Sequence, residues 1–119
     1  MSMGPEELRI RTKQFAVRIV RLYKSLPFSA DAQVLGKQLL RCGTSVAANY
    51  RAACRGRSRA EWIARIGLVV EEADESCFWL EMPSDCDIVQ AERLKDLQQE
   101  ALELSKLFTA SQRTARKGG

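Results

Sequence analysis

The chain has 119 residues, of which 45% are hydrophobic and 29% are charged, a size and composition typical of one globular domain with its own core. The formal net charge of +4 is well short of the charge of a strongly basic nucleic-acid-binding protein. Histidine, the commonest general base and metal ligand, does not occur, so we expect no catalytic residues, no metal and no cofactor.

The cysteines and the apolar stretches both favour a cytoplasmic protein. No apolar run approaches the roughly 20 residues of a membrane span, and the N-terminal residues lack the apolar segment of a signal peptide, so we expect no membrane contact. The cysteines show no CxxC spacing, and we expect reduced thiols, the first three in the core. They are Cys42, Cys54, Cys77 and Cys86.

The first predicted helix covers residues 6–26. Phe15, Ile19 and Leu22 belong to a stripe with the spacing of one helical face, and Pro27 prevents the helix from continuing. The face opposite this stripe is predicted to be basic. It carries Arg11, Lys13, Arg18, Arg21 and Lys24.

The second predicted helix covers residues 31–55 and is unusually rich in small side chains. Gly36 and Gly43 lie within it, and each glycine costs about 1 kcal/mol of helix stability relative to alanine. Ala47 and Ala48 also have small side chains, which offer little area for contact with a neighbouring helix. We therefore expect the backbone of a neighbouring helix to pack closely against these positions.

The third predicted helix covers residues 59–82. Ser58 and Glu61 have the spacing of a capping box, in which Ser58 accepts a hydrogen bond from the amide of Glu61 and the Glu61 carboxylate reaches back. Pro83 is expected to end the helix.

The fourth predicted helix covers residues 87–111 and has the cleanest heptad spacing of apolar residues in the chain. The polar and basic residues 112–119 are expected to fray. Four amphipathic helices with short connections predict an all-α fold of residues 1–119 as a single domain, an up-down-up-down antiparallel four-helix bundle.

Charge is distributed unevenly along the chain. Residues 1–26 hold six basic and two acidic groups, whereas residues 59–82 hold two basic and six acidic groups. We expect two surfaces of opposite sign, suited to packing against each other or against other subunits.

Polar residues on the second and third predicted helices form the first candidate site. Asn49 lies on the small-residue seam, and Glu72 and Glu75 lie near the apolar stripe of the third helix, so an antiparallel pair would let them meet. We favour a structural network that fixes the register of the helices. The alternative is a pair of carboxylates for acid/base or metal chemistry, although no accompanying nucleophile motif is present.

A basic group surrounds the predicted turn between the second and third helices. Arginine suits bidentate phosphate contacts, so this group is a candidate for nucleic-acid or anion contact. The alternative is a solvated turn, or salt bridges to the acidic third helix of the same or a neighbouring subunit. The group consists of Arg51, Arg55, Arg57 and Arg59.

Aromatic residues on the third predicted helix form the third candidate site. Phe78 and Trp79 are adjacent in sequence, so their side chains point about 100° apart and at least one must lie at the edge of the bundle. We assign both to an oligomer interface, with base stacking as the alternative, and Trp62 to the core.

Several motifs in residues 39–81 combine into a family resemblance. They are Ser45-Val46-Ala47-Ala48-Asn49, the turn Gly56-Arg57-Ser58, and Glu72-Ala73-Asp74-Glu75 leading to Phe78-Trp79-Leu80-Glu81. In this order, over most of residues 10–112, the chain resembles the four-helix-bundle proteins of the 23S rRNA-intervening sequence family. Many members have Ile-Ala-Glu-Gly after the asparagine, whereas this chain has Tyr50-Arg51-Ala52-Ala53, which makes its turn more basic.

The resemblance implies more than the residues alone. Ser45 joins the polar register network through the shared motif. The family is similar to the accessory variability proteins of diversity-generating retroelements, which form ring-like homopentamers and bind nucleic acid with a reverse transcriptase. The resemblance therefore implies a homo-oligomer, a pentamer, with RNA or DNA among its partners. The family name describes gene position and implies no ribosomal function.

Three hypotheses follow for the function. The preferred one is a non-enzymatic homo-oligomeric scaffold or assembly protein. The alternative is a nucleic-acid-binding accessory protein in which repeated Arg51, Arg55 and Arg57 patches contact phosphates. An enzyme that uses Glu72 is the third.

Overall fold

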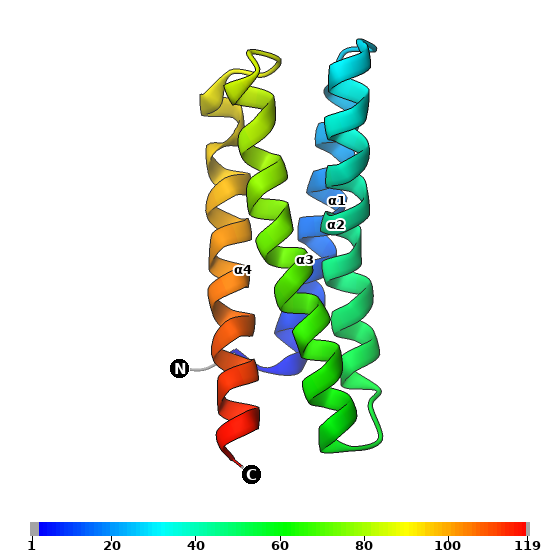
Figure 1. The fold of residues 1–119 in the computed structure, drawn as a ribbon, viewed down its shortest axis with the longest axis vertical. Helices are drawn as coiled ribbons and strands as arrows, with labels where there is room; N and C mark the ends of the chain where they lie inside the picture. Colours follow the sequence, from blue (N-terminus) through cyan, green and yellow to red (C-terminus); the bar gives the residue numbers. More distant parts are fainter. Residues whose placement is uncertain (1–2, 119) are drawn as a thin grey trace.

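The computed structural model describes residues 3–118 as four helices joined by short connections (Figure 1). Consecutive helices run antiparallel and pack side by side, while α1 and α3, like α2 and α4, occupy opposite corners, and the backbones of these diagonal pairs do not approach closely in the described chain. This is the predicted up-down-up-down bundle. The helices are α1 (Pro5–Ser25), α2 (Ala30–Cys54), α3 (Arg59–Asp85) and α4 (Ala91–Lys117).

The connection between α3 and α4 differs from the prediction. Pro83 lies inside α3, which ends at Asp85, because a proline in the last turn costs only one intrahelical hydrogen bond and its ring is buried. Its carbonyl oxygen accepts hydrogen bonds from the amides of Ile88 (2.8 Å) and Val89 (3.1 Å), which turn the chain. This turn uses the residues that were expected to begin the fourth helix at 87, so α4 begins four residues later.

The C-terminal residues also differ from the prediction. Residues 112–117, expected to fray, continue α4 as a helix, and residue 119 lies outside the described residues. The Arg59 guanidinium donates hydrogen bonds to the carbonyl oxygens of Ala115 and Gly118 (2.8 Å to Gly118). These donors stabilise the last turn because its carbonyls have no intrahelical partner.

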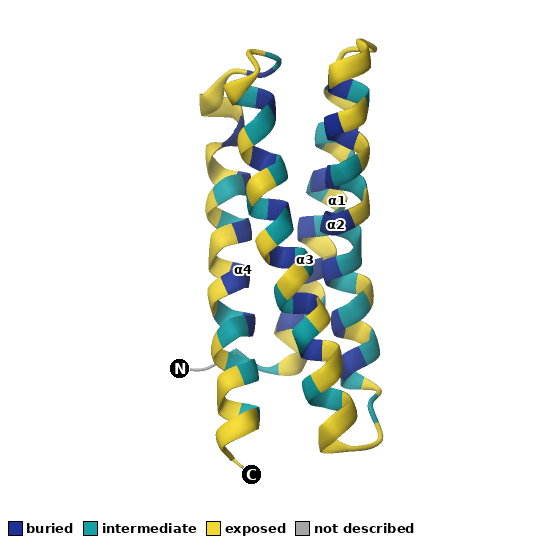
Figure 2. Cartoon of the chain, viewed as in Figure 1, coloured by how far each residue is buried: buried dark blue, intermediate teal, exposed yellow. Residues whose placement is uncertain are grey.

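The buried residues line the inner faces of all four helices (Figure 2). Tyr50 of α2 lies near the centre of an aromatic group, with its ring centroid 5.1 Å from that of Phe108 and 6.3 Å from that of Trp62. A smaller cluster under the α1–α2 and α3–α4 connections closes one end of the bundle. It consists of Leu26, Ala32, Val89 and Leu94.

The two glycines of α2 accommodate side chains of α1, whereas the sequence predicted a close backbone. A Cβ atom at Gly43 would lie 2.8 Å from Cγ1 of Ile19, and one at Gly36 would lie 2.6 Å from Cδ1 of Tyr23. The bulky α1 side chains fill the space left by the missing Cβ atoms. Glycine therefore determines how deeply α1 packs on α2.

Arg11 links α1 to α4, the pair of neighbouring helices that packs least closely. It was expected on the exposed basic face. Instead its Nε and Nη2 donate to both oxygens of Glu100 (2.8 and 2.6 Å), and Nη2 also donates to Glu103 (3.0 Å). The Arg11 side chain is 21% exposed and the Glu100 side chain is 16% exposed, so this bidentate ion pair is partly buried.

The cysteine thiols are free: Cys42 is buried, Cys54 and Cys77 are half-buried, and Cys86 is exposed. The sequence predicted core positions for the first three, and Cys54 and Cys77 pack against the core from its edge. Among the described helices, none combines the length and the hydrophobicity that a bilayer span requires.

Candidate functional site

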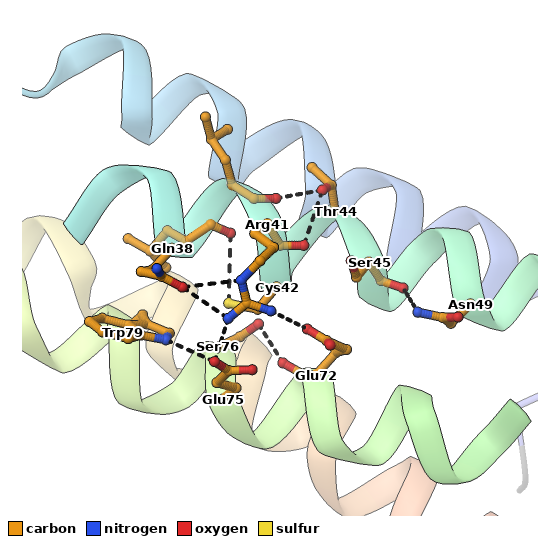
Figure 3. A network of polar contacts seen from close by, with 12 residues as sticks. Gln38, Arg41, Cys42, Thr44, Ser45, Asn49, Glu72, Glu75, Ser76 and Trp79 are labelled. Carbon is orange, nitrogen blue, oxygen red and sulfur yellow. Dashed lines mark hydrogen bonds and ion pairs between the residues drawn. The ribbon is translucent and has the colours of Figure 1, made fainter. Parts of the chain in front are cut away.

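The carboxylates of Glu72 and Glu75 on α3 converge on Arg41 of α2 (Figure 3). One guanidinium nitrogen of Arg41 lies 3.4 Å from Glu72, and another donates a hydrogen bond to Glu75. The Trp79 indole also donates to Glu75, at 3.3 Å. Gln38 accepts two hydrogen bonds from Arg41 and completes a polar network between α2 and α3.

Asn49 and Ser45 lie apart from this network. The Asn49 side-chain amide donates to the carbonyl oxygen of Ser45 at 3.0 Å, within α2 itself, and none of the hydrogen bonds among residues 3–118 joins it to Glu72 or Glu75. Asn49 lies eight residues beyond Arg41, which is about 12 Å along a helix. The predicted meeting of Asn49 with the carboxylates is therefore wrong, and Arg41 is the partner that the sequence analysis missed.

The electrostatics of the two carboxylates differ. The pKa of Glu75 lies below its usual range because the carboxylate accepts hydrogen bonds from Arg41, the larger effect, and from the Trp79 indole. The pKa of Glu72 is raised because burial disfavours the charged form more than Arg41 favours it. Both acids are ion-paired, which suits a structural connection between α2 and α3. In the described residues, no group of three Cys, Asp or Glu side chains is arranged to hold a metal ion.

Replacing Arg41 with methionine is expected to raise the pKa of both carboxyl groups, because each loses its cation. The lowered pKa of Glu75 stabilises the fold at neutral pH, and this contribution is lost as the pH falls through that pKa. The loss at pH 7 should be only about 0–1 kcal/mol, since Arg41 is partly exposed. Carboxyl NMR titration and urea unfolding at pH 7 and pH 3 measure both effects.

Arg9→Met is the matched control, because Arg9 pairs with Glu6 inside the first turns of α1. It should leave the pKa values of Glu72 and Glu75 unchanged. A Glu75 pKa that stays low without Arg41 would contradict the assignment of this ion pair.

The arginines around the α2–α3 turn are separated by the fold. Arg51 and Arg55 line two adjoining hollows of about 390 Å³ each on the surface between α1 and α2. Arg9 and Lys13 of α1 line both hollows as well, and the floor of the first is formed by Thr44, Ala47, Ala48 and Ala52. The contribution of α1 to this basic groove was not predicted, because it depends on which face of α1 lies beside α2.

Arg57 and Arg59 lie outside this groove. The Ser58 hydroxyl accepts a hydrogen bond from the backbone amide of Glu61 (3.1 Å), as predicted. The Glu61 carboxylate accepts a hydrogen bond from the backbone amide of Arg57 (2.8 Å), whereas in the usual capping box it would bond the amide one residue later. The Arg59 side chain is bound to the end of α4. Of the four arginines predicted as one group, Arg51 and Arg55 therefore lie in the same groove, whereas Arg59 stabilises the end of α4.

The aromatic pair of α3 lies at the edge of the bundle, as the sequence predicted for at least one of its members. Phe78 is 50% exposed, whereas Trp79 is half-buried and packs against the core. Their ring centroids are 4.9 Å apart in an edge-to-face arrangement. Trp62, predicted in the core, is also half-buried and packs against it. The interface role of Phe78 and Trp79 remains a prediction.

Exposed apolar side chains also occur on α1. Ile10 is 52% and Val17 is 39% exposed, and both line an open hollow of about 600 Å³ on the α1 surface. The other side chains around this hollow are polar or basic: Lys13, Gln14, Arg18 and Arg21. The outer face of α1 therefore combines apolar groups with positive charge.

Comparisons with known proteins agree with the fold. The family model of the 23S rRNA-intervening sequence protein matches residues 7–110. A crystal structure from Bacteroides thetaiotaomicron, described as a protein with unknown function from the S23 ribosomal protein family, is 34% identical to this chain. The similarity covers 94% of this chain and 100% of that one, with a TM-score of 0.86. None of the curated proteins matches the sequence.

Proposed function

The chain belongs to the 23S rRNA-intervening sequence protein family, and from this premise we propose that it is a non-enzymatic scaffold that assembles as a homo-oligomer. One observation carries the proposal, the segregation of charge onto two helices at opposite corners. Residues 9–24 of α1 include six basic and no acidic residues, whereas residues 68–85 of α3 include six acidic and no basic residues.

Both helices also expose apolar side chains among these charges. Ile10 and Val17 on α1 are 52% and 39% exposed, and Leu68 and Phe78 on α3 are 42% and 50% exposed. Apolar groups rimmed by charge of one sign are typical of protein interfaces, in which opposite charges steer the partners together. Because one chain carries both a basic and an acidic surface, a second copy of the chain supplies an oppositely charged surface for each. A pentamer is the assembly that the family resemblance implies.

The molar mass of the purified protein, measured by light scattering after gel filtration, tests this proposal. We expect a multimer of the 13.4 kDa chain at 0.05 M salt and a lower average mass at 1 M salt, where the Debye length falls to about 3 Å. Phe78→Asp should shift the mass towards the monomer. Leu102→Asp, at a 41% exposed position on α4, is the control and should not. A monomer at every salt concentration would contradict the proposal.

Nucleic acid is a second candidate partner, favoured by the convergence of Arg51 and Arg55 with Arg9 and Lys13 in the groove between α1 and α2. Four cations in one groove suit contacts to successive phosphates, although Arg9 is paired with the Glu6 carboxylate that also lines the groove. An oligomer would repeat these cations. The binding constant for single-stranded and duplex probes should fall as salt rises. The magnitude of the slope of log K against log salt should decrease in the Arg51→Ala/Arg55→Ala variant by about 1.8 for duplex and about 1.4 for single strands. Lys106→Ala/Arg113→Ala, on α4, is the charge-matched control.

A further inference from the structure

We propose that copies of this chain join head to tail, with the outer face of α3 in one copy docked on the outer face of α1 in the next. The proposal rests on the proposed homo-oligomer and names the surfaces that form its interface. Two independent features of the fold support it, the spacing of the exposed residues and the positions of α1 and α3 in the bundle.

The outer face of α3 is defined by Glu71, Phe78 and Asp85. These residues are spaced seven apart, so they lie along one line of the helix, on the side opposite the buried Ile66, Ala73 and Leu80. All three are exposed. Asp74 and Glu81, also exposed, lie along one side of this line, where the Asp74 carboxylate accepts a hydrogen bond from the Ser105 hydroxyl of α4. Phe78 therefore stands as an apolar centre among four carboxylates.

The outer face of α1 is defined by Ile10, Val17 and Lys24. They repeat the same spacing of seven residues and lie opposite the buried Leu8, Phe15 and Ile19. Lys13 and Arg21 are exposed on either side of this line. This face thus has two apolar residues among three cations.

The two faces match in spacing and are opposite in charge. Seven residues advance about 10 Å along a helix, so the two lines can run alongside each other with Phe78 seated between Ile10 and Val17. The carboxylates around Phe78 then face Lys13, Arg21 and Lys24. Pairing α1 with α1, or α3 with α3, would instead bring charges of like sign together, which disfavours a two-fold symmetric contact.

The positions of the helices allow each copy to use both faces at once. α1 and α3 occupy opposite corners of the bundle, and in the view of Figure 1 α3 crosses in front of the lower half of α1. Their outer faces therefore point to opposite sides of the molecule. A head-to-tail contact of this kind closes into a ring when the rotation between copies permits it.

Mixing two variants tests the pairing of faces. Val17→Asp places an acid in the basic face and leaves the α3 face intact, whereas Phe78→Arg places a cation in the acidic face and leaves the α1 face intact. Each variant alone should be a monomer by light scattering. An equimolar mixture should form a complex of at least twice 13.4 kDa, because one intact α3 face meets one intact α1 face.

Several outcomes would overturn the pairing. Assembly of either variant alone would show that its altered face is dispensable. A mixture that stays monomeric while the unaltered protein assembles would show that the intact α3 and α1 faces do not pair. An unaltered protein that is itself monomeric would instead overturn the proposed homo-oligomer. Both substitutions are at exposed positions, so circular dichroism and thermal melting should show unchanged folding.

Discussion

Gly43→Ala is expected to destabilise the protein by about 1–3 kcal/mol, although alanine is normally the better helix former. The new Cβ would lie 2.8 Å from Cγ1 and 3.2 Å from Cβ of Ile19. Ile19 is fully buried, so it has no room to move away without displacing α1 from α2. Urea unfolding monitored by circular dichroism measures the loss.

Gly67→Ala is the matched control on α3. Its Cβ would approach only the amide nitrogen of Gln112, at 3.1 Å, and the end of this flexible side chain can move aside. The gain in helix propensity should then dominate and raise the free energy of unfolding by about 0.5–1 kcal/mol. Equal effects of the two substitutions would contradict the close approach of Ile19 to α2.

Phe108→Ala is expected to cost about 3–5 kcal/mol, the largest loss that we predict for a single substitution. Phe108 is fully buried, and its ring centroid lies 5.1 Å from that of Tyr50, so truncation leaves a cavity at the centre of the aromatic group. A loss of this size is a large fraction of the stability of a typical domain. It should appear as a lower urea midpoint and a lower melting temperature.

Phe28→Ala provides the comparison, because Phe28 is 96% exposed at the α1–α2 connection. It removes the same atoms from a side chain that makes almost no packing contacts, and the unfolding free energy should change by less than about 0.5 kcal/mol. A loss at Phe108 as small as the one expected at Phe28 would mean that the packing around Phe108 is not as tight as the structure indicates.

The helices were predictable from sequence because apolar spacing and capping residues are local signals. The Ser58 cap is one such case, since both partners lie within four residues. The end of α3 was not predictable from Pro83 alone. The place of Pro83 inside the helix depends on burial of its ring and on the amides of Ile88 and Val89, which only the folded turn brings to the Pro83 carbonyl.

The candidate sites were only partly predictable, because they depend on the register between helices. The sequence predicts Glu72 and Glu75 in a polar network with Asn49, but their partner in the structure is Arg41. The partner depends on the axial register of α2 relative to α3. Likewise, Arg9 and Lys13 join Arg51 and Arg55 through the rotation of α1 about its axis. Sequence periodicity indicates the buried face of each helix but not which neighbour flanks it.

The loose seam between α1 and α4 has a consequence for how the protein folds. Since nearly all close backbone approaches join helices that follow each other in the chain, most native contacts form between segments that are close in sequence. Low contact order of this kind is associated with folding in microseconds to milliseconds. Polar contacts between the first and last helices come from Arg11 with its two glutamates and from the Arg93–Ser25 hydrogen bond, and their backbones approach each other the least among neighbouring helices. We therefore expect this seam to be the last to close and the first to open in hydrogen exchange.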